Sequence, residues 1–331
     1  MDDRKKSHIE LALDNQIEVS SNDERFYYEP LMAPHYENFD KPVDFLGFRL
    51  QYPVWVSSMT GGTKMAGTIN HNLARLCNEF GLGMGLGSCR VLLENDNYLD
   101  DFNVKKIIGA NQPLFANIGI SQAENLIEKK EIHKINDLLA KLQADGLIIH
   151  VNPLQEFTQP EGDRLKRKPI EIIEILTSEI KTLFIVKEVG QGMGPESLNS
   201  LLKLKIDAIE FGAFGGTNFA SIELQRVGAR QKEMYLPLVR IGHSAAEMLE
   251  FINSYIEKQK PLHCKNLIIS GGIKSFLDGY YFTEKSVLPA IYGQASAFLK
   301  YAQGSYSELK EFFEFQIKGL ILARSFLKIR K

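Results

Sequence analysis

The sequence predicts a (β/α)8 barrel with an N-terminal extension. Eight short apolar segments recur along the chain, each ending in glycine or polar residues. Helical patterns lie between them, and this repeated alternation favours a closed barrel of parallel strands over an open sheet. The length of 331 residues suits one large barrel or two ordinary domains. We therefore expect a single domain over residues 1–331, with residues 1–50 as an extension or lid.

The candidate strands are almost continuously apolar, as expected of strands buried on both faces. They are VWVSSM (54–59), GLGMGLG (81–87), LFANIG (114–119), GLIIHVN (146–152), FIVKEV (184–189), AIEFGA (208–213), NLIISGG (267–272) and AIYGQA (290–295). The second is the weakest, because glycine disfavours strands.

Helical patterns fill the intervals between these strands. They cover 66–80, 134–144, 169–180, 195–203 and 244–258. The last begins with a capping box, because Glu247 follows Ser244 by three residues. The stretch SELKEFFEFQIKGLILARSFLKIR (307–330) predicts a long amphipathic helix with a basic end, which suits a helix C-terminus.

Composition argues against several classes of protein. The formal net charge is −2, so a basic footprint for nucleic acid is not evident. The sequence shows no apolar run of about 18 residues and no apolar segment typical of a secretory signal near its start. Three scattered cysteines are too few for a disulfide framework or a zinc site. A cytoplasmic protein with no membrane or nucleic-acid partner fits best.

In such barrels the site lies at the C-terminal ends of the strands. Here those ends are MTGGT, GSCR, NIG, HVNPLQE, KEVGQG, FGAFGGTN, SGGIK and GQAS, all rich in glycine or polar residues. The opposite strand ends carry few such residues. The sequence therefore places the site at one rim of the barrel.

Three glycine turns on this rim predict a phosphate site. SGGIKSFLD (270–278) puts two glycines before a helix start, where backbone N–H groups can approach an anion. GQAS (293–296) and GAFGGTN (212–218) offer similar turns. Any one of them is as readily a tight connection without a ligand. Three together, including the turns after strands 7 and 8, favour bound phosphate.

Other rim residues suit a flat heterocycle. Lys187 ends an apolar strand, and a lysine there is seldom buried unless it is paired. It either forms a salt bridge to Glu188 or Glu210, or faces an anionic ring or phosphate. MTGGT (59–63) and NIG (117–119) supply hydrogen-bond donors for one edge of a ring. These features predict a flavin mononucleotide site, and the strand–GxGxxG–helix nicotinamide fingerprint is missing from the start of the chain.

The stretch HVNPLQEFTQPEGD (150–163) is the most polar segment of the rim. Glu156 and Glu161 are hard oxygen ligands suited to Mg²⁺. Asn152 and Gln155 can hold a substrate by hydrogen bonds, and His150 can contact phosphate or move a proton. The plainer alternatives are a core histidine with its hydrogen bonds satisfied and a solvated loop.

Basic residues near the N-terminus have no predicted partner. Arg4, Lys5, Lys6 and His8 precede any core element, and such residues usually form a solvated tail. If the N-terminal segment folds across the barrel mouth, Arg4 and Lys5 could join Arg90 and His150 in clamping a diphosphate. Charge-assisted bonds of this kind contribute roughly 1.5–3 kcal/mol each.

The motifs RKKSHIE, MTGGT, GSCR, HVNPLQEFTQPEGD, KEVGQGMG, GAFGGTNFASIELQR and SGGIKSFLDG resemble those of type II isopentenyl diphosphate isomerases. The match runs from about residue 4 to 300 in the expected order. The resemblance implies interconversion of isopentenyl and dimethylallyl diphosphates without net redox change. It also implies reduced FMN, NADPH as reductant, Mg²⁺, and a homo-oligomer, either a tetramer or an octamer.

The resemblance also assigns roles to individual residues. Diphosphate binding falls to Arg4, Lys5, Arg90, His150 and Asn152; Gln155 lies beside the reacting carbon, with His150 as the other candidate catalytic group; and Glu156 is the Mg²⁺ ligand. The FMN contacts are Met59, Thr60, Gly61, Ser88, Asn117, Lys187, Thr217, Gly271, Gly272, Gly293, Gln294 and Ala295.

Four positions depart from the family pattern. They are Cys89 for glutamine, Gly194 for serine, Phe219 for tryptophan and Lys274 for arginine. A rival hypothesis is a flavin-dependent oxidoreductase of the 2-hydroxy acid oxidase or inosine monophosphate dehydrogenase class. It would need a histidine base at the flavin or a nucleophilic cysteine, for which Cys89 is the rim candidate. A non-catalytic binding protein is a third possibility.

Overall fold

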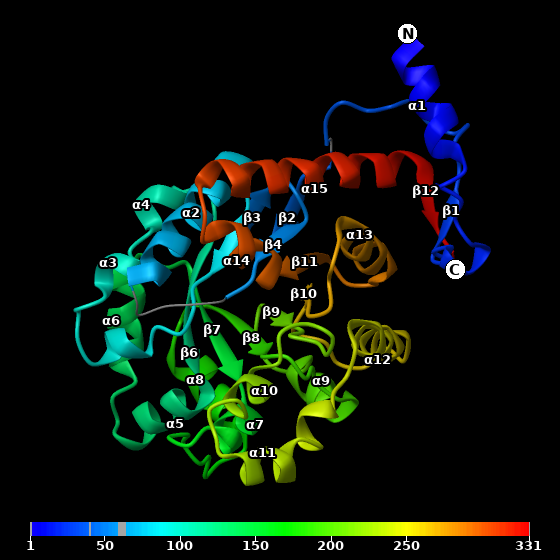
Figure 1. Ribbon diagram of the computed structural model, residues 1–331. Helices are drawn as coiled ribbons and strands as arrows, with labels where there is room; N and C mark the ends of the chain where they lie inside the picture. Colours follow the sequence, from blue (N-terminus) through cyan, green and yellow to red (C-terminus); the bar gives the residue numbers. More distant parts are fainter. Residues whose placement is uncertain (1, 40, 59–63, 331) are drawn as a thin grey trace.

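A closed barrel of eight parallel strands forms the centre of the molecule (Figure 1). The computed structural model describes residues 2–39, 41–58 and 64–330. Around the barrel the strands follow the order β10-β11-β4-β5-β6-β7-β8-β9. They are β4 (Val54–Val56), β5 (Gly83–Gly85), β6 (Leu114–Gly119), β7 (Gly146–Val151), β8 (Leu183–Glu188), β9 (Ala208–Glu210), β10 (Asn266–Ser270) and β11 (Ala290–Gln294). Each predicted strand is present, and the predicted fold class is confirmed.

The outer layer is helical. Its larger helices are α2 (Lys64–Phe80), α5 (Ile120–Glu128), α6 (His133–Leu142), α8 (Pro169–Glu179), α9 (Pro195–Leu201), α12 (Ala245–Glu257), α13 (Phe276–Lys285), α14 (Ser296–Ala302) and α15 (Tyr306–Phe326). Short helical pieces lie in the connections: α3 (Leu99–Phe102), α4 (Lys105–Ile108), α7 (Pro153–Thr158), α10 (Phe219–Glu223), α11 (Ala229–Tyr235) and the 3-10 turns η2 (Arg90–Leu93) and η3 (Leu238–Arg240). The capping box predicted at Ser244 and Glu247 is present.

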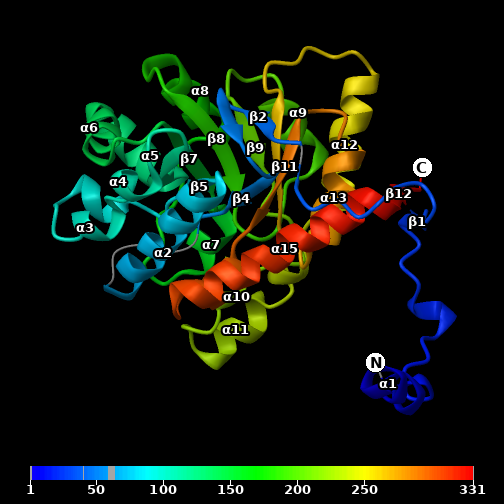
Figure 2. The ribbon, with the colours of Figure 1, turned by 90° about the horizontal axis from the view of Figure 1, so that it is seen from above.

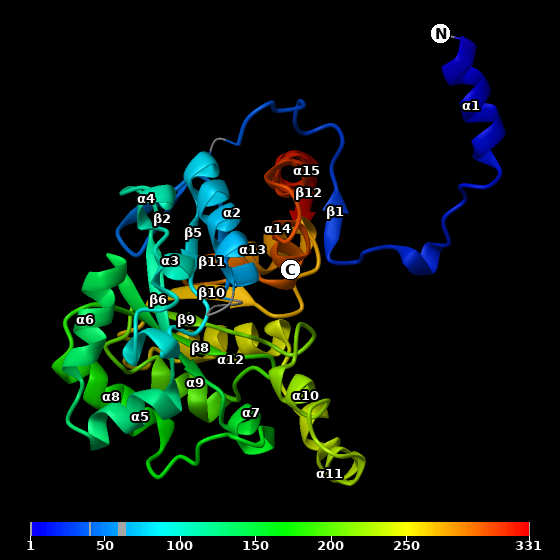
Figure 3. The ribbon, with the colours of Figure 1, turned by 60° about the vertical axis from the view of Figure 1, so that its left-hand side comes forward.

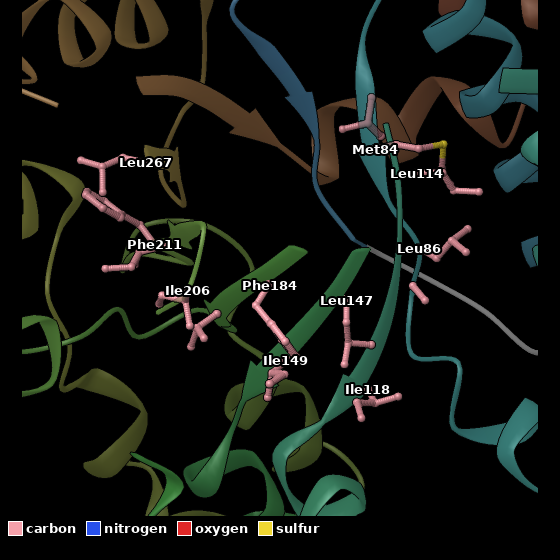
Figure 4. Close-up of a cluster of buried hydrophobic side chains, with 14 of the residues drawn as sticks. Met84, Leu86, Leu114, Ile118, Leu147, Ile149, Phe184, Ile206, Phe211 and Leu267 are labelled. Atoms are coloured by element: carbon pink, nitrogen blue, oxygen red, sulfur yellow. The ribbon is translucent and has the colours of Figure 1, made fainter. Parts of the chain in front are cut away.

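The main core lies between the strands and these helices. Outward-facing strand residues pack there with helix residues in one large apolar cluster. Figure 4 shows part of it, with Leu147 and Ile149 of β7 and Phe184 of β8 on neighbouring strands. Because alternate strand residues point to opposite faces, the remaining residues line the inside of the barrel.

Inside the barrel, an apolar ring lies nearer the strand N-termini. It consists of Trp55, Phe115, Ile148, Ile185, Ala208, Ile268 and Ile291. The hairpin of β2 (Val43–Phe45) and β3 (Phe48–Leu50) packs Phe45 and Leu50 against this ring. These two side chains are 1% and 0% exposed, so the hairpin shields the inner ring from water at that end. The barrel therefore opens to ligands at the strand C-termini.

The N-terminal segment is attached through a two-stranded sheet. Strand β1 (Phe26–Tyr28) pairs antiparallel with β12 (Leu327–Ile329). The prediction that one helix runs to the end of the chain is therefore wrong for its last residues: α15 ends at Phe326. Leu327 and Ile329 bury partly in a small cluster with Phe26 and α13, and the strand ladder replaces helical hydrogen bonds there.

Helix α1 (Asp2–Ala12) projects away from the barrel beyond this sheet, as Figures 2 and 3 show. Residues 4–22, which include the 3-10 turn η1 (Val19–Ser21), are all exposed. Most of the α1 side chains are polar, so the helix has no apolar stripe to bury. Within the described residues, no helix combines the length and apolar character needed to span a bilayer.

Candidate active site

A ring of polar side chains lies one step above the apolar ring. Each member follows an apolar-ring residue by two positions, so it points into the barrel on the same face. The polar ring comprises Ser57, Asn117, His150, Lys187, Glu210 and Ser270, with Gly293 at the corresponding position of β11. An apolar floor thus supports a polar layer at the open end of the barrel.

Two adjoining cavities open onto this layer. The larger has a volume of about 370 Å³ and is bounded by the turns after β8, β9, β10 and β11. The smaller, of about 130 Å³, is bounded by Asn117 of β6 and His150 of β7, and by residues that follow β5 and β7. Ser58, Lys187, Val189 and Phe219 line both, so one ligand could extend through the two.

The predicted glycine turns converge on the larger cavity. Its lining includes Thr217, Gly271, Gly272, Gly293, Gln294 and Ala295, as well as Gly215 and Gly216. At Gly271 and Gly272, φ is +86° and +74°, a region that favours glycine. Lys274 and Lys300 add positive charge to the lining. Backbone close to the cavity, together with these two cations, suits a phosphate group.

Lys187 pairs with Glu210 and also lines both cavities. Its side chain is 10% exposed and lines both cavities. Nζ lies 3.8 Å from Oε1 of Glu210 and donates to the Glu188 carbonyl oxygen at 2.8 Å. The Glu188 carboxylate has a different task, because its Oε2 accepts the backbone N–H groups of Gly190, Gln191 and Gly192 at 2.7, 2.6 and 2.9 Å. It therefore shapes the turn after β8.

His150 lies in the smaller cavity as a neutral base. Asn117 donates its amide Nδ2 to the Leu86 carbonyl oxygen, which turns its Oδ1 toward Nδ1 of His150 at 2.8 Å. Nδ1 therefore carries the proton and Nε2 is left as an acceptor. Desolvation, together with the charge of Lys187, lowers the pKa of His150 to about 4. At neutral pH this imidazole is uncharged, and its Nε2 can accept a hydrogen bond from a ligand.

The segment after β7 is a short helix, α7, where the sequence suggested a loop. Pro153 occupies its first position, where the missing N–H costs nothing. Asn152 Nδ2 donates to Oε1 of Gln155 at 3.1 Å and to Oε1 of Glu156 at 3.2 Å. Glu156 is also held by the Ser121 hydroxyl at 3.1 Å. The predicted polar residues of this segment are therefore brought together by hydrogen bonds.

Glu223 joins this network, although no sequence feature singled it out. Gln155 Nε2 donates to Oε1 of Glu223 at 3.3 Å, and Arg226 pairs with Oε2 at 2.6 Å. Arg226 also pairs with Glu161 at 2.5 Å. Glu161 is thus an exposed ion-pair partner, and the structure does not place it as a metal ligand. The i, i+3 spacing of Glu223 and Arg226 was the available signal.

Glu156 and Asn152 are described residues of this segment that could contribute oxygen ligands to a magnesium ion. The described part of the chain contains no cluster of three or more His, Cys, Asp or Glu that could hold a metal by itself. Mg²⁺ commonly takes one or two carboxylates and fills its shell with water and phosphate oxygens. Beside Glu156, the buried Oδ1 of Asn152 has no hydrogen-bond partner. The Glu156 carboxylate accepts hydrogen bonds at both oxygens, from Ser121 and Asn152 at Oε1 and from the Asp163 backbone N–H at Oε2. A magnesium ion here would therefore share Glu156 with these donors.

Comparison with known proteins places this geometry in a family. No protein-family model matches the chain. The isopentenyl-diphosphate delta-isomerase of Rickettsia felis is 34% identical over 323 residues, covering 96% of this chain and 90% of its own length. This chain belongs to the isopentenyl-diphosphate delta-isomerase family. It is therefore an isomerase.

Solved structures similar to this isomerase share its fold. A mutant flavocytochrome b2 with benzoylformate superposes with a TM-score of 0.63 at 12% identity, covering 92% of this chain and 76% of its own. A mutant mandelate oxidase with a monooxide FMN adduct gives 0.56 at 12% identity, covering 93% and 89%. The predicted resemblance to the type II family and the barrel fold are both confirmed.

Some predicted residues lie apart from the two cavities of this isomerase. Arg4 and Lys5 are on the projecting helix α1 and do not meet Arg90 or His150. Arg90 starts η2 and is exposed. Ser88, in contrast, lines the smaller cavity. Met59, Thr60 and Gly61 lie outside the described residues.

Cys89 is unsuited to nucleophilic chemistry in this isomerase. Its side chain is 0% exposed, and Sγ lies 3.4 Å from the Gly87 carbonyl oxygen. Burial raises the pKa of Cys89 to about 12, so the reactive thiolate does not form near neutral pH. The rival oxidoreductase hypothesis therefore loses its candidate cysteine.

Proposed function

We propose that this isomerase interconverts isopentenyl and dimethylallyl diphosphates in isoprenoid biosynthesis, using reduced FMN, Mg²⁺ and NADPH as reductant. The observation that carries the proposal is the junction of the two cavities. A glycine-lined phosphate end leads through Lys187 to a chamber holding His150 and Gln155. The names of the family members support the choice of substrate.

FMN fits the larger cavity by its chemistry. Its phosphate would lie against the turns of Gly271, Gly272 and Gly293, and its ring against Lys187. When bound and reduced, FMN would supply acid–base chemistry at the ring. A cofactor is needed for that step, because none of the described side chains that line the cavities is an acid strong enough to protonate an unactivated alkene.

The side chains bind and orient the substrate. Neutral His150 accepts a hydrogen bond at Nε2, and Glu156 with Asn152 would hold Mg²⁺ against the diphosphate. Gln155, fixed between Asn152 and Glu223, is placed to bound the position of the isoprenoid carbons. Anchoring the polar head converts remote binding energy into positioning of the reacting carbons.

The N-terminal segment completes this proposal. Residues 1–50 would act as an extension of a single barrel domain. Its exposed part, residues 4–22, would close over the mouth and bring Arg4 and Lys5 to the diphosphate near Arg90. The exposed apolar side chains of Ile17 and Leu31, 83% and 93% accessible, support burial against another surface. A homo-oligomer, tetrameric or octameric, in the cytoplasm would provide one.

The test is anaerobic incubation of the protein with FMN, NADPH, Mg²⁺ and isopentenyl diphosphate, followed by identification of the product. We expect a yellow protein and formation of dimethylallyl diphosphate with no consumption of NADPH beyond flavin reduction. The Gln155→Ala variant should lose most turnover. A colourless protein that takes up no FMN would refute the proposal, and substrate-dependent flavin reduction would favour the oxidoreductase.

A further inference from the structure

Glu210 is a carboxylate buried beneath the cofactor cavity. It is the last residue of β9, and its side chain is 0% exposed. Neither carboxylate oxygen has a hydrogen-bond partner. Because Glu210 follows Ala208 of the apolar ring by two residues, its side chain points into the barrel. It therefore lies in the polar ring, below the surface that a ligand would touch.

Such a group is costly to retain. A buried ionised carboxylate without hydrogen bonds loses its hydration, and a nearby cation can offset part of that loss. The strand register aligns Glu210 with Lys187, and Nζ of that lysine lies 3.8 Å from Oε1. The other neighbour in register is Ile268, which has no charge. Among the side chains that the structure describes, Lys187 is the cation that pairs with Glu210.

Lys187 and Glu210 differ in their access to the cavities. Lys187 lines both cavities, whereas Glu210 lines neither. The apolar ring lies directly below them, so the two charges interact through a medium of low polarity. Glu210 can therefore act on a bound cofactor only through Lys187.

We infer that Glu210 is a positioning residue that holds the Lys187 ammonium group at the wall of the cofactor cavity. A lysine side chain has four rotatable bonds, and the single bond to the Glu188 carbonyl leaves two of its donors free. Attraction to the Glu210 carboxylate restricts the orientation of the ammonium group. Its remaining N–H groups are then directed toward the cavity. This inference rests on the proposed FMN site.

A double-mutant cycle tests the inference. The variants are Glu210→Gln, Lys187→Met and the two combined, and the readout is the dissociation constant of FMN from quenching of its fluorescence. We expect Glu210→Gln to weaken FMN binding about tenfold in the wild type and to have no effect in the Lys187→Met background. Glu210→Asp, which keeps the charge, should recover most of the affinity.

Asp207→Asn is the matched control. Asp207 precedes the same strand, and its carboxylate accepts the Phe184 backbone N–H at 2.7 Å at the closed end of the barrel. The substitution removes a partly buried carboxylate without touching the cavity, so FMN affinity should not change. An equal loss in this variant would show that the effect of Glu210→Gln is a general loosening of the fold, and would overturn the inference.

Unfolding of the apoproteins in urea provides a second readout that needs no cofactor. Lys187→Met leaves Glu210 unpaired, and adding Glu210→Gln should restore stability. A contrary outcome is that the two substitutions are coupled in their effects on the free energy of unfolding but additive in their effects on FMN affinity. That result would show that the pair is only structural, and it would overturn the positioning role. Wild-type protein that binds no FMN would refute the proposed function itself, before any variant is compared.

Discussion

Alanine substitutions at two adjacent glycines after β10 test whether the backbone turn there shapes the cofactor cavity. Gly271 and Gly272 both have left-handed φ, at +86° and +74°. A Cβ at 271 would lie 2.1 Å from the Ala213 carbonyl oxygen and 2.2 Å from its nitrogen. At 272 the nearest atom would be the Phe214 carbonyl oxygen at 3.4 Å. Substitution by alanine therefore imposes the same backbone strain at both positions and a collision at only one.

The size of each effect follows from these distances. Alanine in the left-handed region costs roughly 1–2 kcal/mol, which is the whole cost expected for Gly272→Ala. Gly271→Ala must also separate two backbone segments by about 1 Å to reach ordinary contact. Such overpacking adds about 1–3 kcal/mol, and it moves the turn out of position.

The assays are urea unfolding of the apoproteins and FMN titration by fluorescence. We expect Gly271→Ala to lose about 3 kcal/mol or more of the free energy of unfolding, and to bind FMN at least about a hundredfold more weakly. Gly272→Ala should stay within about tenfold of the wild-type affinity. Equal losses in the two variants would refute the steric reasoning.

Three further predictions concern the surroundings of the site. Glu188→Ala leaves three backbone N–H groups without their acceptor, so we expect it to lose about 3 kcal/mol in urea unfolding, whereas Glu188→Gln, which keeps an acceptor oxygen, should lose less than half of that. Because the pKa of His150 is about 4 in the folded protein, against 6.5 for a free histidine, the unfolded chain binds more protons between these values. The stability from neutral His150 is thus complete above pH 6.5 and declines as the pH falls toward 4. Wild-type apoprotein should lose up to about 3 kcal/mol more than His150→Gln over that range, and parallel stability curves would contradict this. Arg25→Ala removes the 2.8 Å ion pair to Asp278. We expect the peptide bonds before β1 to be cleaved faster in limited proteolysis, with little loss of global stability. An unchanged cleavage rate would show that this ion pair does not hold the segment in place.

The fold was predictable because the physical demand on each strand is simple. A strand covered by helices outside and side chains inside is apolar along its length, as Ile148 on the inner face and Ile149 on the outer face illustrate. The end of α15 was not predictable in this way. The helical pattern continues through Leu327, and only pairing with a segment about 300 residues away replaces it with a strand.

Some site residues were also predictable from the local sequence pattern, and others were not. Lys187 and His150 stand out as polar residues at the ends of apolar strands, so local pattern reveals them. Glu223 contacts Gln155 across 68 residues, and no local pattern encodes that contact. The positions of Arg4 and Lys5 depend on what the N-terminal segment packs against, which the spacing of residues cannot specify.

The β1–β12 sheet makes two segments that are about 300 residues apart depend on each other. Phe26 pairs with Ile329 and Tyr28 with Leu327, so β1 is held by a strand that is synthesised long after it. During translation, β1 can therefore take up its final attachment only after β12 has left the ribosome.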